Sequence, residues 1–260
     1  MDKPVTVNPW QSLRRFTAAR IALGRSGVSQ PTTEQLAFQL DHARARDAVH
    51  LALDHEVLGE TLTASGMQCV SVQSAARDRQ VYLQRPDLGR RLDDASREKL
   101  AAIAGPRYDL AFVVADGLSA LAIEQNATPF LRSLMPRLAG WRIAPITIVR
   151  QGRVAIGDEI GDLLGAQIVV VLIGERPGLS SPDSMGLYLT WAPRPGLSDA
   201  DRNCISNVRS AGLTYEAAAF KLHYLLSESR RRQLSGVALK DETASESANL
   251  EAPQRNFLLE

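Results

Sequence analysis

A glutamate at the end of an apolar run is the clearest candidate for chemistry in this sequence. Glu175 lies in the motif Gly174-Glu-Arg-Pro-Gly178, directly after the apolar positions 168–173. Such a run predicts a strand buried on both faces, and the glycines and proline predict a tight loop at its end. Ligands of open parallel sheets bind beyond the carboxyl ends of the strands. A carboxylate there accepts hydrogen bonds from a ligand or from neighbouring loops, and the residues alone leave both roles open.

Two further apolar runs end in loops that contain glycine. Asp116-Gly117 follows residues 109–115, and Gly152-Arg-Val154 follows residues 145–149. Together with the Glu175 loop, they would form one edge of a parallel sheet. Backbone groups and shape dominate such an edge, which suits holding a large ligand better than reacting with a small one.

General acids, bases and nucleotide fingerprints are scarce. The sequence has no G-x-G-x-x-G after a strand, no P-loop, no G-x-S-x-G elbow and no H-E-x-x-H helix. His223 is the only histidine after residue 108, and it lies within a predicted helix. The other histidines, His42, His50 and His55, have no recognisable metal-ligand spacing. We therefore expect no catalytic residue and no metal ligand on this chain.

Arginines gather in the turn Arg85-Pro-Asp-Leu-Gly-Arg-Arg-Leu92. Guanidinium groups pair with carboxylates and phosphates through two-point contacts. Arg85, Arg90 and Arg91 could hold a cofactor phosphate or the acidic patch of a partner, or they could tie this turn to the neighbouring domain. The sequence leaves these alternatives open.

Charge and cysteine content limit the class of protein. The 260 residues carry 30 basic and 29 acidic side chains, so a net charge of +1 gives no general attraction for nucleic acid or an anionic membrane. Two cysteines, Cys69 and Cys204, and no recognisable signal peptide favour a reduced, cytoplasmic setting without a disulfide framework. No apolar run approaches the roughly 20 residues that a membrane span needs, so a membrane-spanning protein is excluded.

Hydrophobic periodicity predicts a helical first part and an alternating second part. Helices are expected over residues 10–23 and 32–51, and a short strand over 80–84. Further strands are expected over residues 109–115, 145–149, 167–173 and 186–191, and helices over 120–138, 158–164 and 214–233. This alternation predicts an α/β fold, with a Rossmann-like parallel sheet flanked by helices and preceded by a mainly helical N-terminal segment. The domains are then residues 1–105, 106–240 and a polar, acidic tail, 241–260, predicted to be disordered.

Several motifs together resemble one family, the small (light, β) subunit of adenosylcobalamin-dependent ethanolamine ammonia-lyase. The likeness covers roughly residues 8 to 240 at matching separations. It rests on the arginine turn 85–92 and on Leu13-Arg-Arg-Phe-Thr-Ala-Ala-Arg20, Asp116-Gly-Leu-Ser119, Gly152-Arg-Val154, Asp158-Glu-Ile-Gly161, Leu164-Gly-Ala166, Gly174-Glu-Arg-Pro-Gly-Leu179 and Asp201-Arg-Asn-Cys-Ile-Ser-Asn207.

The resemblance implies an enzyme subunit that is inactive without its large (α) partner. In this family a barrel-shaped large subunit binds ethanolamine, and cobalamin lies between the chains. An adenosyl radical takes a hydrogen from the substrate, and the products are acetaldehyde and ammonia. The small-subunit cobalamin contacts of the family map onto Val154, Glu175 and Cys204. Residues 1–105 would then make subunit contacts, and 106–240 would bind cobalamin.

The resemblance also implies a hexamer of heterodimers in the cytoplasm, enclosed in some relatives within a bacterial microcompartment. Because no D-x-H-x-x-G motif is present, the benzimidazole of the cofactor should stay on cobalt, and Cys204 should not be a cobalt ligand. Without the resemblance, Val154 and Cys204 would be interpreted as buried apolar residues. Asp116 and Asn207 are further candidates, although either could cap a turn or helix. The alternative functions are a stand-alone Rossmann nucleotide-binding module and a non-catalytic regulatory subunit.

Overall fold

The apolar run at 168–173 forms a strand that is buried along almost its whole length, as the sequence predicts. It lies inside a six-stranded sheet in the computed structural model, which describes residues 5–105 and 107–243. The strands are β1 (Cys69–Gln73), β2 (Tyr108–Ala115), β3 (Ile146–Arg150), β4 (Ala166–Gly174), β5 (Met185–Trp191) and β6 (Arg202–Val208). The α-helices are α1 (Thr32–His50), α2 (His55–Ala64), α3 (Arg79–Gln84), α4 (Asp94–Ile103), α5 (Ala120–Leu134), α6 (Ile156–Leu163) and α7 (Tyr215–Arg232). The α/β class is therefore confirmed.

The sheet is mixed, so the prediction of a Rossmann-like parallel sheet is wrong for its last two strands. Its order is β1-β3-β2-β4-β5-β6, and the first four strands in that order are parallel. Strand β5 runs antiparallel to β4, and β6 runs antiparallel to β5. The reason lies in the connection 175–184, which contains no helix. A parallel neighbour needs a crossover, whereas a chain that turns back directly pairs antiparallel.

Helices cover the two faces of the sheet unequally. On one face, α2, α5 and α7 pack against side chains such as Leu110, Phe112 and Leu172. On the other face, α4 and α6 pack against Val113 and Val171. This second face continues over β5 and β6. Along β6, Arg202, Ile205 and Val208 are buried, and the residues between them are partly or fully exposed. We call the side of β5 and β6 that lies beside α6 the open face.

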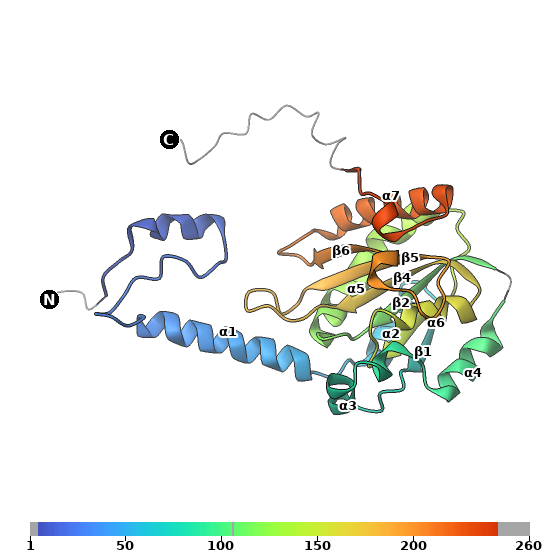
Figure 1. Ribbon diagram of the computed structural model, residues 1–260, viewed down its shortest axis with the longest axis horizontal. Helices are drawn as coiled ribbons and strands as arrows, with labels where there is room; N and C mark the ends of the chain where they lie inside the picture. Colours follow the sequence, from blue (N-terminus) through green and yellow to red (C-terminus); the bar gives the residue numbers. More distant parts are fainter. Residues whose placement is uncertain (1–4, 106, 244–260) are drawn as a thin grey trace.

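The N-terminal arm, residues 5–51, extends away from the sheet (Figure 1). The helix expected over residues 10–23 is only a 3-10 helix, η1 (Pro9–Phe16), and none of its residues is buried. A short helix gains most of its stability from packing, and this one has no apolar surface to pack against. The helix expected over 32–51 is confirmed as α1, of which only Ala48 is buried. The large exposed hydrophobic side chains of the arm are Val7, Trp10, Phe16, Ile21, Val28, Leu36, Phe38, Leu40 and Leu51.

Two short elements between the arm and β2 differ from the prediction. Residues 80–84 belong to helix α3 rather than to a strand, because Asp78 caps the helix by accepting a hydrogen bond from the backbone N–H of Val81 at 2.8 Å. Strand β1 was not predicted, and it pairs in parallel with β3 at the edge of the sheet.

No helix among the described residues is long and apolar enough to cross a membrane. The predicted tail, 241–260, lies outside the described residues from position 244 onward.

Candidate functional site

Asp116 links the loops that follow β2 and β3. Its Oδ1 accepts hydrogen bonds from the backbone N–H groups of Gly117 and Gly152, and its Oδ2 accepts one from Gln151, each at 3.0 Å. The guanidinium of Arg79 lies 3.6 Å away. Burial raises the pKa of Asp116 to about 6, against the opposing effects of Arg79 and the three N–H donors. The local partners use both carboxylate oxygens, so Asp116 shapes this edge of the sheet rather than presenting a free group to a ligand.

Gly174 brings the end of β4 against the loop after β2. Its carbonyl oxygen accepts a hydrogen bond from the N–H of Leu118 at 2.9 Å. A Cβ at position 174 would lie 2.0 Å from the carbonyl oxygen of Ser119 and 2.6 Å from that of Asp116. Only glycine fits this contact, which holds the start of the Glu175 loop in place.

Glu175 joins the β4–β5 loop to the end of β6. Its carboxylate accepts hydrogen bonds from the Ser184 hydroxyl, from the Ser206 hydroxyl at 2.6 Å and from the backbone N–H of Asn207 at 3.3 Å. Its own N–H donates to the Ser184 carbonyl at 2.9 Å. The predicted strand-end position of Glu175 is therefore confirmed, and three donors orient its carboxylate.

Cys204 and Tyr188 lie side by side on the open face. They are paired residues of β6 and β5, and their side chains share a hydrogen bond. Burial raises the pKa of the Cys204 thiol, and the charge of Glu175 raises it further, while the Tyr188 hydrogen bond opposes both effects. Burial likewise raises the pKa of Tyr188, which feels the charge of Glu175 as well. These three side chains therefore form one cluster.

Val154 lies in the turn between β3 and α6 and packs against the same side of the sheet as Tyr188. It lines a pocket of about 390 Å³ together with Arg90, Arg153 and Arg202. Arg202 begins β6, two residues before Cys204, so this pocket borders the open face. The structure thus places Val154 at the rim of the surface to which the cluster of Glu175, Tyr188 and Cys204 belongs.

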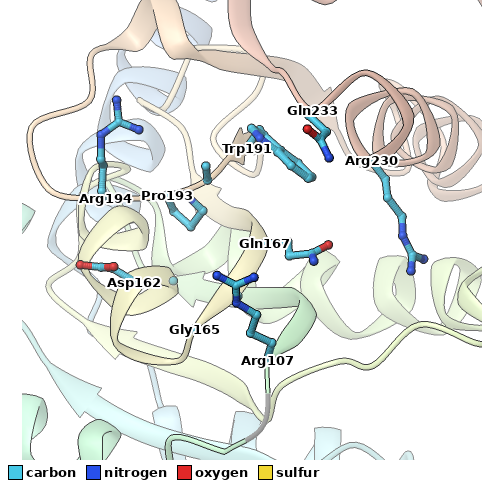
Figure 2. A pocket seen from close by; sticks show the side chains of 12 residues that line it. Arg107, Asp162, Gly165, Gln167, Trp191, Pro193, Arg194, Arg230 and Gln233 are labelled. Atoms are coloured by element: carbon cyan, nitrogen blue, oxygen red, sulfur yellow. The ribbon is translucent and has the colours of Figure 1, made fainter.

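A larger pocket of about 660 Å³ lies at the other end of the strands, beside the first residues of β4 and the last residue of β5 (Figure 2). Arg107, Arg194 and Arg230 line it, with Trp191 and Gln167 between them. None of the residues predicted to contact a ligand takes part in it. We therefore place the candidate site at the open face and not here.

The comparison with known proteins decides the family. A family model described as "Ethanolamine ammonia-lyase light chain" matches residues 7–240. The chain belongs to this family. A light chain from Ralstonia nicotianae, named "Ethanolamine ammonia-lyase small subunit", is 60% identical over 266 residues and covers 100% of this chain and 98% of its own length. Relatives of the same name from Pseudomonas paraeruginosa and Azotobacter vinelandii are each 59% identical, covering 97% and 98% of this chain and 94% and 97% of their own.

The family resemblance of the motifs is thereby confirmed, and the name of these relatives implies a large-subunit partner. Within residues 5–105 and 107–243, this light chain has no group of three or more His, Cys, Asp or Glu side chains that could hold a metal ion.

Sequence reasoning missed Tyr188, the third member of the cluster on the open face. The available signal was the alternation of the strand 186–191, in which the tyrosine stands between Leu187 and Leu189. Both leucines are buried in the core, so the residue between them must face the other side of the sheet.

The raised pKa of Cys204 predicts slow alkylation of the free light chain at neutral pH. The thiolate is the reactive form, and its fraction should stay small until the pH exceeds the ordinary thiol pKa of 9.0. We expect the rate of labelling by iodoacetamide, followed by mass spectrometry, to climb beyond pH 9 and to be faster in Glu175→Gln, which loses a nearby negative charge. A rate that levels off below pH 8 would contradict this assignment.

Proposed function

We propose that this light chain works with a large subunit to hold adenosylcobalamin for the radical deamination of ethanolamine to acetaldehyde and ammonia. The observation that carries the proposal is the grouping of Val154, Glu175 and Cys204 around one open face in a chain of this family. When bound, the cofactor supplies the radical chemistry. The residues of this chain bind and orient it.

The donor set of the open face fits a corrinoid. Such a ligand has peripheral amides that need both donors and acceptors, and the face offers the Glu175 carboxylate and the hydroxyls of Tyr188 and Ser206. At its rim, the Nε atoms of Arg153 and Arg202 are buried without a hydrogen-bond partner among the described residues. Buried donors of this kind cost free energy until a ligand or water satisfies them. No histidine lies in the three loops, so these loops would hold the cofactor through their carboxylate, hydroxyl and guanidinium groups.

We infer that the N-terminal arm contacts the large subunit. Its exposed apolar side chains are too numerous for a segment that faces only water, and large exposed patches mark interaction sites. Leu179 and Ser180 of the β4–β5 loop line one pocket with Arg20 and Asp41 of the arm. A partner bound to the arm would therefore reach the loop that begins with Glu175. We further propose a hexamer of heterodimers, located in the cytoplasm or within a bacterial microcompartment.

A reconstitution experiment tests the proposal. Ethanolamine deamination with adenosylcobalamin would be measured for this chain, for the large subunit and for the two together. We expect activity only in the mixture, with cobalamin absorbance retained on the complex through gel filtration. Full activity of the large subunit alone, or chains that do not associate, would contradict it. Either result would favour an independent nucleotide-binding module or a non-catalytic regulatory subunit.

Glu175→Gln should weaken cofactor retention without unfolding the chain. A charged acceptor forms a stronger hydrogen bond to a cofactor amide than a neutral one, so we expect the neutral side chain to raise the Kd for cobalamin about ten-fold, which corresponds to roughly 1.5 kcal/mol. Equilibrium dialysis of the complex measures this Kd. The control is Glu98→Gln, on the exposed surface of α4. Equal affinities of the two variants would exclude this role for Glu175.

A further inference from the structure

The pocket beside the first residues of β4 has the composition of an anion site. The carboxylate of Asp162 lines it together with three guanidinium groups, those of Arg107, Arg194 and Arg230. Arg230 pairs with Asp109, which lies outside the lining and also pairs with Arg142. Four guanidinium groups and two carboxylates leave two positive charges in excess. The carboxyl ends of α6 and α7 offset only part of this excess, since each carries roughly half a negative charge.

Arg107 and Arg194 are the arginines of this pocket whose donors are unused. Among the described residues, neither side chain forms an ion pair or a hydrogen bond, whereas Arg230 stacks on the Trp141 ring at 4.7 Å and pairs with a carboxylate. Figure 2 shows the Arg107 guanidinium pointing toward the middle of the pocket, and Arg194 on the wall to the upper left. Guanidinium groups bind phosphate and carboxylate oxygens through two-point contacts.

Trp191, Gln167 and Gln233 give the pocket an aromatic ring and two amides. In Figure 2 the Trp191 side chain lies between Gln233 and Gln167, above Arg107. No side-chain hydrogen bond of these three residues is formed in the part of the chain that the structure describes. An indole ring stacks on planar groups, and a glutamine amide both donates and accepts hydrogen bonds. This set matches a planar heterocycle whose edge has donors and acceptors.

The walls of the pocket are fixed by the chain itself. The N–H of Ala192 donates to the carbonyl oxygen of Gln167 at 2.8 Å. Ala192 has a φ of 46°, in the left-handed region, and such a conformation persists only where the surroundings hold it. A Cβ on Gly161 would lie 2.5 Å from Pro193 Cγ, so α6 packs directly against the segment that contains Arg194. A preformed pocket loses little free energy when a ligand orders it.

The pocket has the dimensions of a small-molecule site. Its volume of about 660 Å³ falls within the range of roughly 300–1,000 Å³ that is typical of ligand pockets. Strands β4 and β5, which border it, both lie inside the sheet, so neither offers a free edge to an extended acidic peptide. A small anion with a planar group is therefore the better match.

We propose that this pocket binds a nucleoside diphosphate, with Arg107 and Arg194 on the phosphate oxygens and Trp191 against the base. Two phosphates provide acceptors for two guanidinium groups, and an aromatic side chain stacks on any base. The sequence has neither G-x-G-x-x-G nor a P-loop, and this site needs neither, because side chains rather than loop N–H groups hold the phosphates. The site goes beyond the proposed function and does not depend on it, because Glu175 follows the opposite end of β4.

Three ligands test this site on the complex with the large subunit. ADP has both the phosphates and the base, pyrophosphate has the phosphates alone, and adenosine has the base alone. Isothermal titration calorimetry measures each Kd, and we expect ADP to bind most tightly. Arg107→Gln and Arg194→Gln should each raise the Kd for ADP and for pyrophosphate about ten-fold, because each removes charged hydrogen bonds. Trp191→Leu should raise the Kd for ADP about ten-fold and leave that for pyrophosphate unchanged.

Arg231→Gln is the matched control for the arginine variants. Arg231 follows Arg230 in α7, pairs with Glu228 at 2.6 Å and does not line the pocket. The control changes the net charge by the same amount and should bind all three ligands like the unchanged complex. Saturating cobalamin should likewise leave the Kd for ADP unchanged.

The outcomes separate this site from the proposed function. A complex that binds neither ADP nor pyrophosphate, or from which cobalamin displaces ADP, overturns the site and leaves the proposed function intact. Losses that are absent in Arg107→Gln and Arg194→Gln, or equally large in Arg231→Gln, overturn it as well. If ADP and pyrophosphate bind with the same affinity, the pocket takes the phosphates alone, and the assignment to a nucleoside diphosphate is wrong. ADP binding by a complex that does not retain cobalamin would overturn the proposed function alone.

Discussion

Gly174→Ala is expected to lower the free energy of unfolding of this light chain by about 3 kcal/mol or more. The new methyl group would meet the carbonyl oxygen of Ser119 at 2.0 Å, and backbone atoms on both sides leave it no space. The loops after β2 and β4 must then separate, and Glu175 moves with the second. We expect urea unfolding to show a lower midpoint with an unchanged slope, and the complex to lose cobalamin on gel filtration.

Gly59→Ala is the matched control for that substitution. Its Cβ would contact Ile148 Cδ1 at 3.6 Å, an ordinary van der Waals distance, within helix α2. Alanine in a helix is about 0.5–1 kcal/mol more favourable than glycine. The control should therefore unfold at the same or a higher urea concentration. Equal midpoints for Gly174→Ala and the unchanged chain would show that the two loops are not in the contact described.

A second large decrease in the free energy of unfolding is expected for Arg202→Met. This substitution leaves the Asp158 carboxylate, whose side chain is 3% exposed, without its charge partner. Breaking a buried ion pair on one side typically costs about 3–5 kcal/mol. The double variant Arg202→Met with Asp158→Leu removes both charges and should regain most of this loss. Denaturant unfolding of the single and double variants measures the difference.

The loss of stability in Arg202→Met should also depend on pH. Burial already raises the pKa of Asp158 to about 6 in the folded chain, with Arg202 opposing the rise. Without Arg202 the folded pKa moves higher still. A carboxyl whose folded pKa lies above its unfolded value loses stability as the pH rises through the folded pKa. The single variant should therefore be closer in stability to the unchanged chain at pH 5 than at pH 8. A constant difference would mean that Asp158 is not left buried and charged.

The strands that could be predicted are those whose buried residues form a continuous apolar run in the sequence. Strand β4 is apolar because both its faces are covered, and this shows in the residues alone. Whether β5 runs parallel or antiparallel to β4 depends on whether the 175–184 connection contains a helix. The hydrophobic pattern of β5 itself is the same in both cases. Strand β1 is as long as β3, but Ser71 and Gln73 interrupt its apolar residues, so it does not stand out among helices. The prediction of a strand at 80–84 is wrong because the residue that indicates a helix there, the N-cap Asp78, lies before the segment.

A residue of the candidate site could be predicted only where its position follows from the residues directly beside it in the sequence. Glu175 follows a buried strand, so its position at a strand end could be predicted. The partners of its carboxylate are 9 to 32 residues away, and the ion pair between Asp158 and Arg202 spans 44. Contacts of that separation arise from the folding of the sheet. No residue spacing in the sequence predicts these contacts.

The apolar side chains of the N-terminal arm have a consequence for the cell. Trp10, Phe16 and Leu36 are each more than half accessible to water in this chain. Surfaces of that kind aggregate, and chaperones and proteases remove the molecules that carry them. If the large subunit covers this arm, as proposed, synthesis of the two subunits has to be matched in amount and time, because a surplus of the small chain would leave these side chains exposed to cellular quality control.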